Sequence, residues 1–300
     1  MVDAVVGALL RAQNADGGWG AEEGKRSNTE ATALAALALG SAGDGALRER
    51  GMRGVAWLAR LQGADGSWPL SADVRQPSWT TSLAVLALVG LDVERDRAVL
   101  GLRWLVGHGG ERLGWIASLL YRFWPTALPA RMDPDLRGWP WTLGAFSWVE
   151  PTAYALLALK KGRAHTAGLP AGERIGEAER MIYDRMCQGG GWNYGNSNVL
   201  GEQIPPYAEV TALTLLALQD RRESAAHQQS LQALRRMLPE VRSGFALAWA
   251  VLCLSVHGEE VSALRDALRT AFERTGFLGV TRTLALALLA SSGRPGAFVL

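Results

Sequence analysis

The sequence predicts an all-α protein, a single α/α toroid spanning residues 1–300 with about six inner and six outer helices. Three observations support this fold class. Segments rich in alanine and leucine recur along the chain, charged amphipathic stretches separate them, and a turn containing tryptophan leads from an amphipathic stretch to the next Ala/Leu-rich segment. Each pair of helices then takes about 50 residues, a period typical of helical repeat folds.

The inner helices are predicted from segments without a polar stripe, which is typical of helices buried on nearly every side. Clear copies occupy residues 27–39, 77–88, 147–159 and 206–218, and looser copies occupy 242–254 and 280–290. Aligned on their last leucine, the clear copies place four threonines in one column: Thr32, Thr81, Thr152 and Thr211. Two positions earlier, a second column contains three acids and one aromatic residue: Glu30, Trp79, Glu150 and Glu209.

The outer helices are predicted from amphipathic stretches such as 47–62 and 171–186. Tight turns follow outer helices at residues 13–20 (QNADGGWG), 62–69 (QGADGSWP) and 188–195 (QGGGWNYG). Asp-Gly and Gly-Gly supply the positive φ that such turns require. We expect each tryptophan to cover the seam between neighbouring helical hairpins, and each glutamine to bond free backbone groups at helix ends. Direct contact of these residues with a ligand is the alternative.

Composition and charge indicate an ordinary globular protein without a nucleic-acid partner. Hydrophobic residues make up 48% of the chain and charged residues 20%, and 31 basic and 29 acidic residues leave a formal charge of +2. Cys187 and Cys253 have no partner at metal-ligand spacing, so neither a disulfide framework nor a zinc site is indicated. The first residues lack a basic region and no segment reaches roughly 18 apolar residues, so we predict a cytoplasmic protein.

The repeated Gln-x-x-x-Gly-x-Trp turns, each followed by an Ala/Leu-rich helix, resemble the QW repeats of the terpenoid cyclase superfamily, which includes squalene-hopene cyclases and protein prenyltransferases. The resemblance covers nearly the whole chain, although the last two repeats lack the Gln-Trp turn. It implies an α/α toroid and an apolar, isoprenoid-like substrate. The superfamily also includes regulatory subunits and thioester-bearing domains, so activity has to be inferred from the site residues.

The resemblance assigns catalysis to Glu150. In the related cyclases, an Asp-x-Asp-Asp-Thr-Ala motif opens an inner helix, and its middle acid protonates an alkene or epoxide. Aligned through Thr152 and Ala153, this motif places Glu150 at the proton-donor position, and Trp148 and Pro151 stand where the family has further acids. Glu150 is therefore the candidate catalytic acid.

Helix capping is the structural alternative for Glu150 and Glu30. Ser147-x-x-Glu150 and Ser27-x-x-Glu30 both fit the capping box. Pro151 is best tolerated at the first helical position, which would make Glu150 itself the N-cap. In either interpretation, we expect the three acids of the column to ring one opening of the barrel, where like charges raise one another's pKa.

Aromatic and acidic residues around this opening are the candidate substrate-binding residues. Aromatic faces stabilise carbocations and also form an apolar surface for a prenyl chain. The candidates are Trp79, Glu30, Trp141, Trp148, Tyr154, Trp192, Tyr194, Tyr207, Glu209, Phe245 and Trp249. Core packing is the alternative for about half of the tryptophans and tyrosines, since these residues are also common in buried seams.

Motifs for metal or cofactor chemistry are missing, so we predict no metal and no cofactor. The chain has no adjacent Asp-Asp, no zinc set of Asp, Cys and His, and no Gly-rich phosphate loop. Residues 200–206 (LGEQIPP) are similar to a thioester motif, but Leu200 stands where the cysteine must be.

Two further features leave alternatives open. Residues 112–132 are apolar and aromatic with arginine at the edges, which suits either an interfacial segment with peripheral membrane contact or a helix packed over a barrel end. The related cyclases join two barrels and work between them, so the resemblance implies either a partner subunit or a different active site. The sequence therefore predicts a terpene cyclase-like protein acting on a polyprenyl substrate, with a non-catalytic module that binds an apolar ligand or a partner protein as the alternative.

Overall fold

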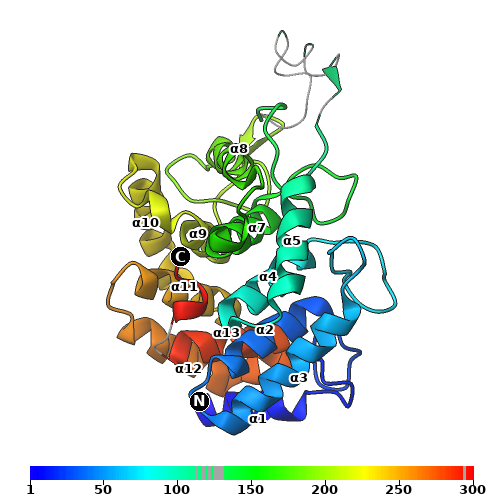
Figure 1. Cartoon of the computed structure of the whole chain (residues 1–300). Coiled ribbons are helices and arrows are strands. Elements are labelled where there is room, and N and C mark those ends of the chain that lie inside the picture. The colour runs from blue at the N-terminus through cyan, green and yellow to red at the C-terminus, as the bar shows by residue number, and fades with distance from the viewer. Residues whose placement is uncertain (113, 116–118, 120–122, 124–131, 293–294) are drawn as a thin grey trace.

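Helices account for nearly all the regular structure in the computed structural model, which describes residues 1–112, 114–115, 119, 123, 132–292 and 295–300 (Figure 1). The inner helices are α2 (Thr29–Gly40), α4 (Thr80–Leu91), α7 (Val149–Lys161), α9 (Ala208–Ala217), α11 (Gly244–Val256) and α13 (Thr281–Ser291). The outer helices are α1 (Val2–Arg11), α3 (Gly45–Leu61), α5 (Arg95–Gly107), α8 (Ala171–Asp184), α10 (Ala225–Met237) and α12 (Ser262–Thr275). Strands β1 (Asn198–Val199) and β2 (Glu202–Gln203) form a small antiparallel hairpin.

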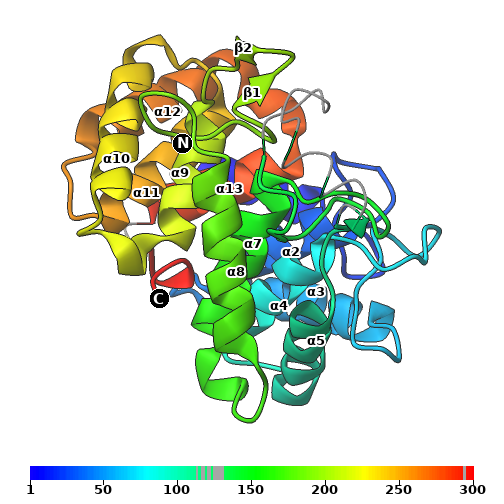
Figure 2. The ribbon, with the colours of Figure 1, turned by 90° about the horizontal axis from the view of Figure 1, so that it is seen from above.

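The inner helices form a closed ring. Along the chain, α2 packs on α4, α4 on α7, α7 on α9, α9 on α11 and α11 on α13, and α13 returns to α2. Each inner helix is covered by an outer one (Figure 2), and α1 is the one that packs on α13. The predicted fold class, an α/α toroid, is confirmed.

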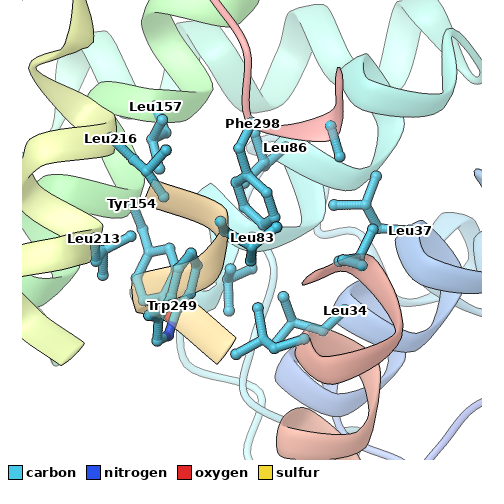
Figure 3. Packing of buried hydrophobic residues seen from close by; sticks show 14 of the residues in the cluster. Leu34, Leu37, Leu83, Leu86, Tyr154, Leu157, Leu213, Leu216, Trp249 and Phe298 are labelled. Atoms are coloured by element: carbon cyan, nitrogen blue, oxygen red, sulfur yellow. The ribbon is translucent and has the colours of Figure 1, made fainter. Parts of the chain in front are cut away.

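Alanine and leucine explain why these helices form the ring. In α2 every residue except Glu30 is buried, because the helix is enclosed by its inner neighbours and by α3. Small alanine side chains let neighbouring helices approach closely. Longer side chains from the inner helices converge at the centre, where leucines pack with Tyr154, Trp249 and Phe298 (Figure 3).

The threonine column and the tryptophan turns form one repeated hydrogen-bond unit. The Trp19 backbone N–H donates to Thr32 Oγ1 at 2.9 Å, and its indole Nε1 donates to the Leu9 carbonyl of α1 at 2.7 Å. The same unit recurs in the pairs Trp68–Thr81, Trp139–Thr152 and Trp192–Thr211. Each tryptophan thus joins the end of an outer helix to the start of an inner helix, as predicted for three of the turns. Trp139 marks a fourth turn, which has no glutamine and was not predicted.

The glutamine prediction is confirmed for two turns and wrong for the third. Gln13 Nε2 donates to the carbonyl of Gly17 at 2.9 Å and to that of Arg50 in α3 at 3.0 Å. Gln62 makes the corresponding bonds to Gly66 and to Arg97 in α5. Gln188 is exposed instead, because it lies four residues before Trp192, whereas Gln13 and Gln62 lie six residues before their tryptophans; Met186 occupies the equivalent position in the third turn.

The final residues close the ring at the end where the inner helices terminate. Phe298 is fully buried, and its ring centroid lies 5.2 Å from that of Trp249. Gln219 Nε2 donates to the Phe298 carbonyl at 2.7 Å, and Lys161 Nζ donates to the carbonyls of Gly296 and Val299 at 2.8 Å each. Residues 295–300 therefore act as a plug at this end of the axis.

The apolar segment predicted at 112–132 falls largely outside the described residues. In the part of the chain that the structure describes, no helix combines the length and the apolar character needed to cross a membrane.

Candidate functional site

The opposite end of the toroid, where the inner helices begin, carries the candidate site. The predicted column of acids and Trp79 lies at the start of the inner helices. Five inner helices carry a residue of this column, or its structural equivalent, at their second position, and in α4 the equivalent residue stands just before the helix begins. We call this set the mouth ring; in ring order it is Glu30, Trp79, Glu150, Glu209, Phe245 and Arg282. This order puts Glu150 and Arg282 on opposite sides of the opening.

Two of the three acids have polar partners. Arg282 Nη1 donates to Glu30 Oε1 at 3.2 Å, and the same guanidinium lies over the Phe245 ring, 4.7 Å from its centroid. The Tyr194 hydroxyl donates to Glu209 Oε1 at 3.0 Å. Glu150 has no hydrogen bond or ion pair to any residue that the structure describes, although the residue is only 6% exposed.

Glu150 is not the N-cap of its helix, so that prediction is wrong. Trp148 is the N-cap, and Pro151 occupies the third helical position. Pro151 fits there because the first four N–H groups of a helix have no acceptor within the helix. The capping box is absent as well, since Ser147 Oγ accepts from the Gly138 N–H at 2.8 Å.

The capping box predicted for α2 is also wrong. The N-cap is Asn28, whose side chain accepts from the Ala31 N–H at 2.9 Å. Ser27 instead donates its hydroxyl to Asp16 in the preceding turn. Glu30 and Glu150 are thereby free of capping roles.

The surroundings of Glu150 favour its neutral form. Burial is the largest cause, the negative charges of Glu30 and Glu209 add to it, and the positive charge of Arg282 partly offsets it. Together they raise the pKa of Glu150 from 4.5 to about 8. At pH 7 the protonated form therefore exceeds the ionised form by about tenfold. The three acids do lie near one another, as predicted.

Burial also governs the other titratable groups of the mouth. It raises the pKa of the hydroxyls of Tyr154 and Tyr194, and nearby carboxylates raise both further. Burial lowers the pKa of Arg282, but the attraction of Glu30 outweighs this effect and leaves the pKa raised. Arg282 is therefore positively charged and both tyrosines are neutral near neutral pH.

Aromatic rings extend from the mouth ring into the barrel. The ring centroids of Trp141 and Trp79 are 4.8 Å apart, those of Trp79 and Tyr154 are 5.7 Å apart, and those of Tyr154 and Trp249 are 6.0 Å apart. Phe245 follows at 6.4 Å from Trp249. A continuous aromatic surface thus runs beside Glu150, because Tyr154 lies one helical turn below it on α7.

A second aromatic pair borders Glu209. Tyr194 and Tyr207 have ring centroids 5.5 Å apart, and Tyr207 is 45% exposed. Trp148 is also exposed and packs its ring over Gly195, outside the aromatic surface. Trp192 is fully buried in the seam between α8 and α9, so the structure assigns it to the repeated turn and not to the mouth.

Arg282 is the site residue that the sequence alone did not single out. Phe245 and Arg282 both lie in the looser copies, which lack the threonine of the first four repeats. Alignment of those copies by the second residue of each helix would have placed both in the acid column. The signal was therefore present, but it depended on knowing where α11 and α13 begin.

Below the mouth, the barrel axis is filled. The side chains four residues after the mouth positions include Leu34, Leu83, Tyr154, Leu213 and Trp249, each about 1% exposed, and they point toward one another (Figure 3). A narrow apolar crevice of only about 10 Å³ lies to the side, between α4 and α7, and its lining includes Trp79, Trp139 and Pro151. Neither the axis nor this crevice therefore has room for a ligand, which leaves the surface of the mouth.

The described residues contain no group of three or more histidine, cysteine, aspartate or glutamate side chains arranged to hold a metal ion. Cys187 and Cys253 are both buried free thiols, and burial raises the pKa of each. The arrangement at the mouth thus offers acid, aromatic and cationic groups.

Comparison with known proteins supports the fold. No family model matches the sequence, and no curated protein matches it either. Among solved structures, a protein from Actinoplanes is 18% identical with a TM-score of 0.61, and the match covers 99% of this chain and 98% of that one. A variant of the type II terpene cyclase MstE from Scytonema, in complex with its substrate geranylgeranyl dihydroxybenzoate, is 16% identical with a TM-score of 0.61. That match covers 99% of this chain and 97% of the MstE chain.

A third similar structure is alpha-2-macroglobulin from Escherichia coli, at 15% identity and a TM-score of 0.51, with 98% of this chain and 42% of that chain covered. At these identities the comparisons establish architecture alone. The chain therefore has a terpene cyclase-like fold.

Proposed function

We propose that this protein is a terpene cyclase-like enzyme in which Glu150 donates a proton to an alkene or epoxide of an apolar polyprenyl substrate. The observation that carries the proposal is the state of Glu150: a buried carboxyl without a hydrogen-bond partner among the described residues, held protonated at neutral pH beside an aromatic surface. A neutral acid with no competing acceptor is free to direct its proton at a ligand.

In this mechanism, the proton passes from the Glu150 carboxyl to the terminal alkene carbon or to the epoxide oxygen. The adjacent carbon becomes positively charged and is attacked by the next double bond, which closes a ring. Trp79 and Trp141, whose ring centroids lie 4.8 Å apart at the mouth, present aromatic faces that stabilise the positive charge. Loss of a proton from the final cation yields a neutral product.

The raised pKa has two effects on such a reaction. It keeps the proton on Glu150 at neutral pH, but it also makes Glu150 a weaker acid than a free carboxyl. The transfer therefore depends on stabilisation of the products of the step. Arg282, across the mouth, stabilises the carboxylate that forms, and the aromatic surface stabilises the cation.

MstE supports the choice of substrate class, because it binds a substrate that carries a geranylgeranyl chain. The MstE chain is also matched over nearly its whole length by this one toroid, so the proposal does not require a partner subunit. Trp79, Trp141 and Tyr207, which are not fully buried, are the residues that we expect to contact the prenyl chain.

The test is conversion of a panel of polyprenyl substrates by the wild type and by Glu150→Gln, with products identified by mass spectrometry. The panel includes squalene, oxidosqualene, farnesyl diphosphate, geranylgeranyl diphosphate and geranylgeranyl dihydroxybenzoate. Glu49→Gln, at an exposed position on α3, is the matched control. We expect cyclised product from the wild type and the control, and none from Glu150→Gln. Equal turnover by Glu150→Gln would contradict the assignment of the acid.

A second candidate function is a non-catalytic module that binds an apolar ligand or a partner protein. It is favoured by the filled axis, where Tyr154, Trp249 and Phe298 leave no deep cavity, and by the exposed rings of Trp148 and Tyr207 at the rim. Absence of product with every substrate, together with saturable binding of the same compounds, would favour this function over catalysis.

A further inference from the structure

The mouth ring has two halves with similar chemistry, and one half already holds a cation. In that half, the Arg282 guanidinium lies between an acid and an aromatic ring, 3.2 Å from Glu30 Oε1 and 4.7 Å from the Phe245 centroid. An acid paired with an aromatic face is the usual environment of a bound organic cation. The chain itself therefore shows that the mouth accommodates a positive group in this way.

The other half has the acids and the aromatic faces without the cation. Glu150 and Glu209 come from the adjacent helices α7 and α9, and Trp79 precedes α4 on the far side of Glu150. Tyr194 and Tyr207 pack as a tilted pair beside Glu209. Within the described part of the chain, neither acid forms an ion pair, and Glu150 is a buried residue, 6% exposed, without a hydrogen-bond partner.

We propose that this half, the cation cage formed by Trp79, Glu150, Tyr194, Tyr207 and Glu209, binds the head of an alkylammonium compound, a tertiary or quaternary amine with an apolar chain. The aromatic faces attract the positive head, and the two acids supply its counter-charge. Trp141 packs edge-on against Trp79 and extends the apolar surface available to the chain of the ligand. The inference goes beyond the proposed reaction, because it requires binding alone.

Binding of such a cation is coupled to a proton. The pKa of Glu150 is near 8 because the carboxylate is buried close to two other acids, and a bound cation lowers it by supplying positive charge. The ligand therefore displaces the proton of Glu150, and its affinity rises as the pH approaches 8. Glu30, Glu209 and Arg282 face Glu150 from α2, α9 and α13, and Arg282 keeps its charge across this range.

Tyrosines near Glu150 do not produce this pH dependence. The pKa values of Tyr154, on α7 itself, and of Tyr194, in the loop before β1, are both raised above the ordinary value for tyrosine. Both hydroxyls consequently stay protonated between pH 6.5 and 8.5, the range that the measurement below uses.

The experiment is isothermal titration of the full chain with octyltrimethylammonium, 1-octanol and octyl sulfate at pH 6.5 and pH 8.5. We expect octyltrimethylammonium to bind at least about tenfold more tightly than octanol, and octyl sulfate to bind most weakly. In the wild type, the Kd for the ammonium compound should fall several-fold between the two pH values. Equal affinity for octyltrimethylammonium and octanol at both pH values would overturn the proposal.

Variants locate the site. Glu150→Gln should abolish the pH dependence, and Glu209→Gln should weaken ammonium binding by about tenfold while leaving octanol binding unchanged. Tyr207→Leu serves as a variant that keeps the core intact, because the side chain is largely exposed, and we expect it to lower ammonium affinity about threefold. Glu49→Gln is the control. Unchanged ammonium affinity in both Glu209→Gln and Tyr207→Leu would place the ligand elsewhere and refute the cage.

This measurement is separate from the test of catalysis. Ammonium selectivity without any cyclised product supports the cage and counts against the proposed reaction. Cyclised product without ammonium selectivity supports the reaction and overturns the cage.

Discussion

Replacement of Glu150 by glutamine should stabilise the protein, and increasingly so as the pH rises. The folded carboxyl has a pKa of about 8, against 4.5 for the ordinary group. Because the folded state binds this proton more tightly than the unfolded chain, the proton favours folding fully below pH 4.5, and the contribution is lost as the pH rises to about 8. Glutamine has the shape of the protonated acid and cannot ionise, so the variant escapes this loss.

The magnitude follows from the shift in pKa. At 1.36 kcal/mol per unit, the advantage of Glu150→Gln is about 1 kcal/mol at pH 5, about 3 kcal/mol at pH 7 and about 4 kcal/mol at pH 8. For a chain of this size, the value at pH 7 corresponds to a rise in Tm of roughly 6 °C. The wild type is therefore less stable than the variant by this free energy, which is the cost of keeping an ionisable carboxyl buried at the candidate site.

Urea unfolding of the wild type and the variant at pH 5, 7 and 8 measures this difference directly. Glu49→Gln is the control, since Glu49 is exposed on α3 and pairs with Arg53 one turn away, a contact worth only a few tenths of a kcal/mol. The reasoning is refuted if the free-energy difference between Glu150→Gln and wild type grows by less than about 1 kcal/mol between pH 5 and pH 8.

Three other perturbations test separate parts of the structure. Thr152→Val removes the acceptor for the Trp139 N–H and should lower the free energy of unfolding by about 1–3 kcal/mol. Thr214→Val, at a buried hydroxyl without a partner among the described residues, should be neutral or stabilising, and urea unfolding measures both variants. Phe298→Ala should cost about 3–5 kcal/mol by leaving a cavity at the plugged end, and a loss below 1 kcal/mol in the same assay would mean that the plug does not pack as described. Arg282→Gln should raise the pKa of Glu150 above its value of about 8, because it removes a nearby positive charge that lowers it; carboxyl titration by NMR measures this pKa, and a fall would contradict the role given to the guanidinium.

The sequence predicted the ring of helices and the tryptophan turns because both follow from local patterns. Helices rich in alanine and leucine on all faces have to be enclosed by other helices. A threonine stands 13 residues after Trp19 and again 13 residues after Trp68, and in both cases it accepts the hydrogen bond from the tryptophan N–H. The approach of the three acids also followed from the repeat, since equivalent positions on equivalent helices meet at one end. These features need only the period of the sequence.

Other features depend on contacts between distant parts of the chain. The pairing of Arg282 with Glu30 joins residues 252 positions apart, and no local pattern marks it. The burial of Phe298 against Trp249 likewise becomes visible only once the ring has closed. The N-cap prediction failed for a different reason. Proline is tolerated at the third helical position as well as at the first, and the helix begins at Val149 because Trp148 is the residue with extended backbone angles.

The mouth ring shows how a repeat produces a site where its copies differ. Six equivalent positions carry three acids, two aromatic residues and one arginine, and a helix N-terminus by itself would favour the ionised form of an acid at such a position. Glu150 remains protonated because burial and the acids of α2 and α9 outweigh that effect. In the cyclases whose motif the sequence around Glu150 resembles, further acids stand next to the proton donor, at the positions of Trp148 and Pro151 here. We infer that Glu30 and Glu209, brought from neighbouring helices by the ring, take the place of those sequence neighbours in setting the protonation of Glu150.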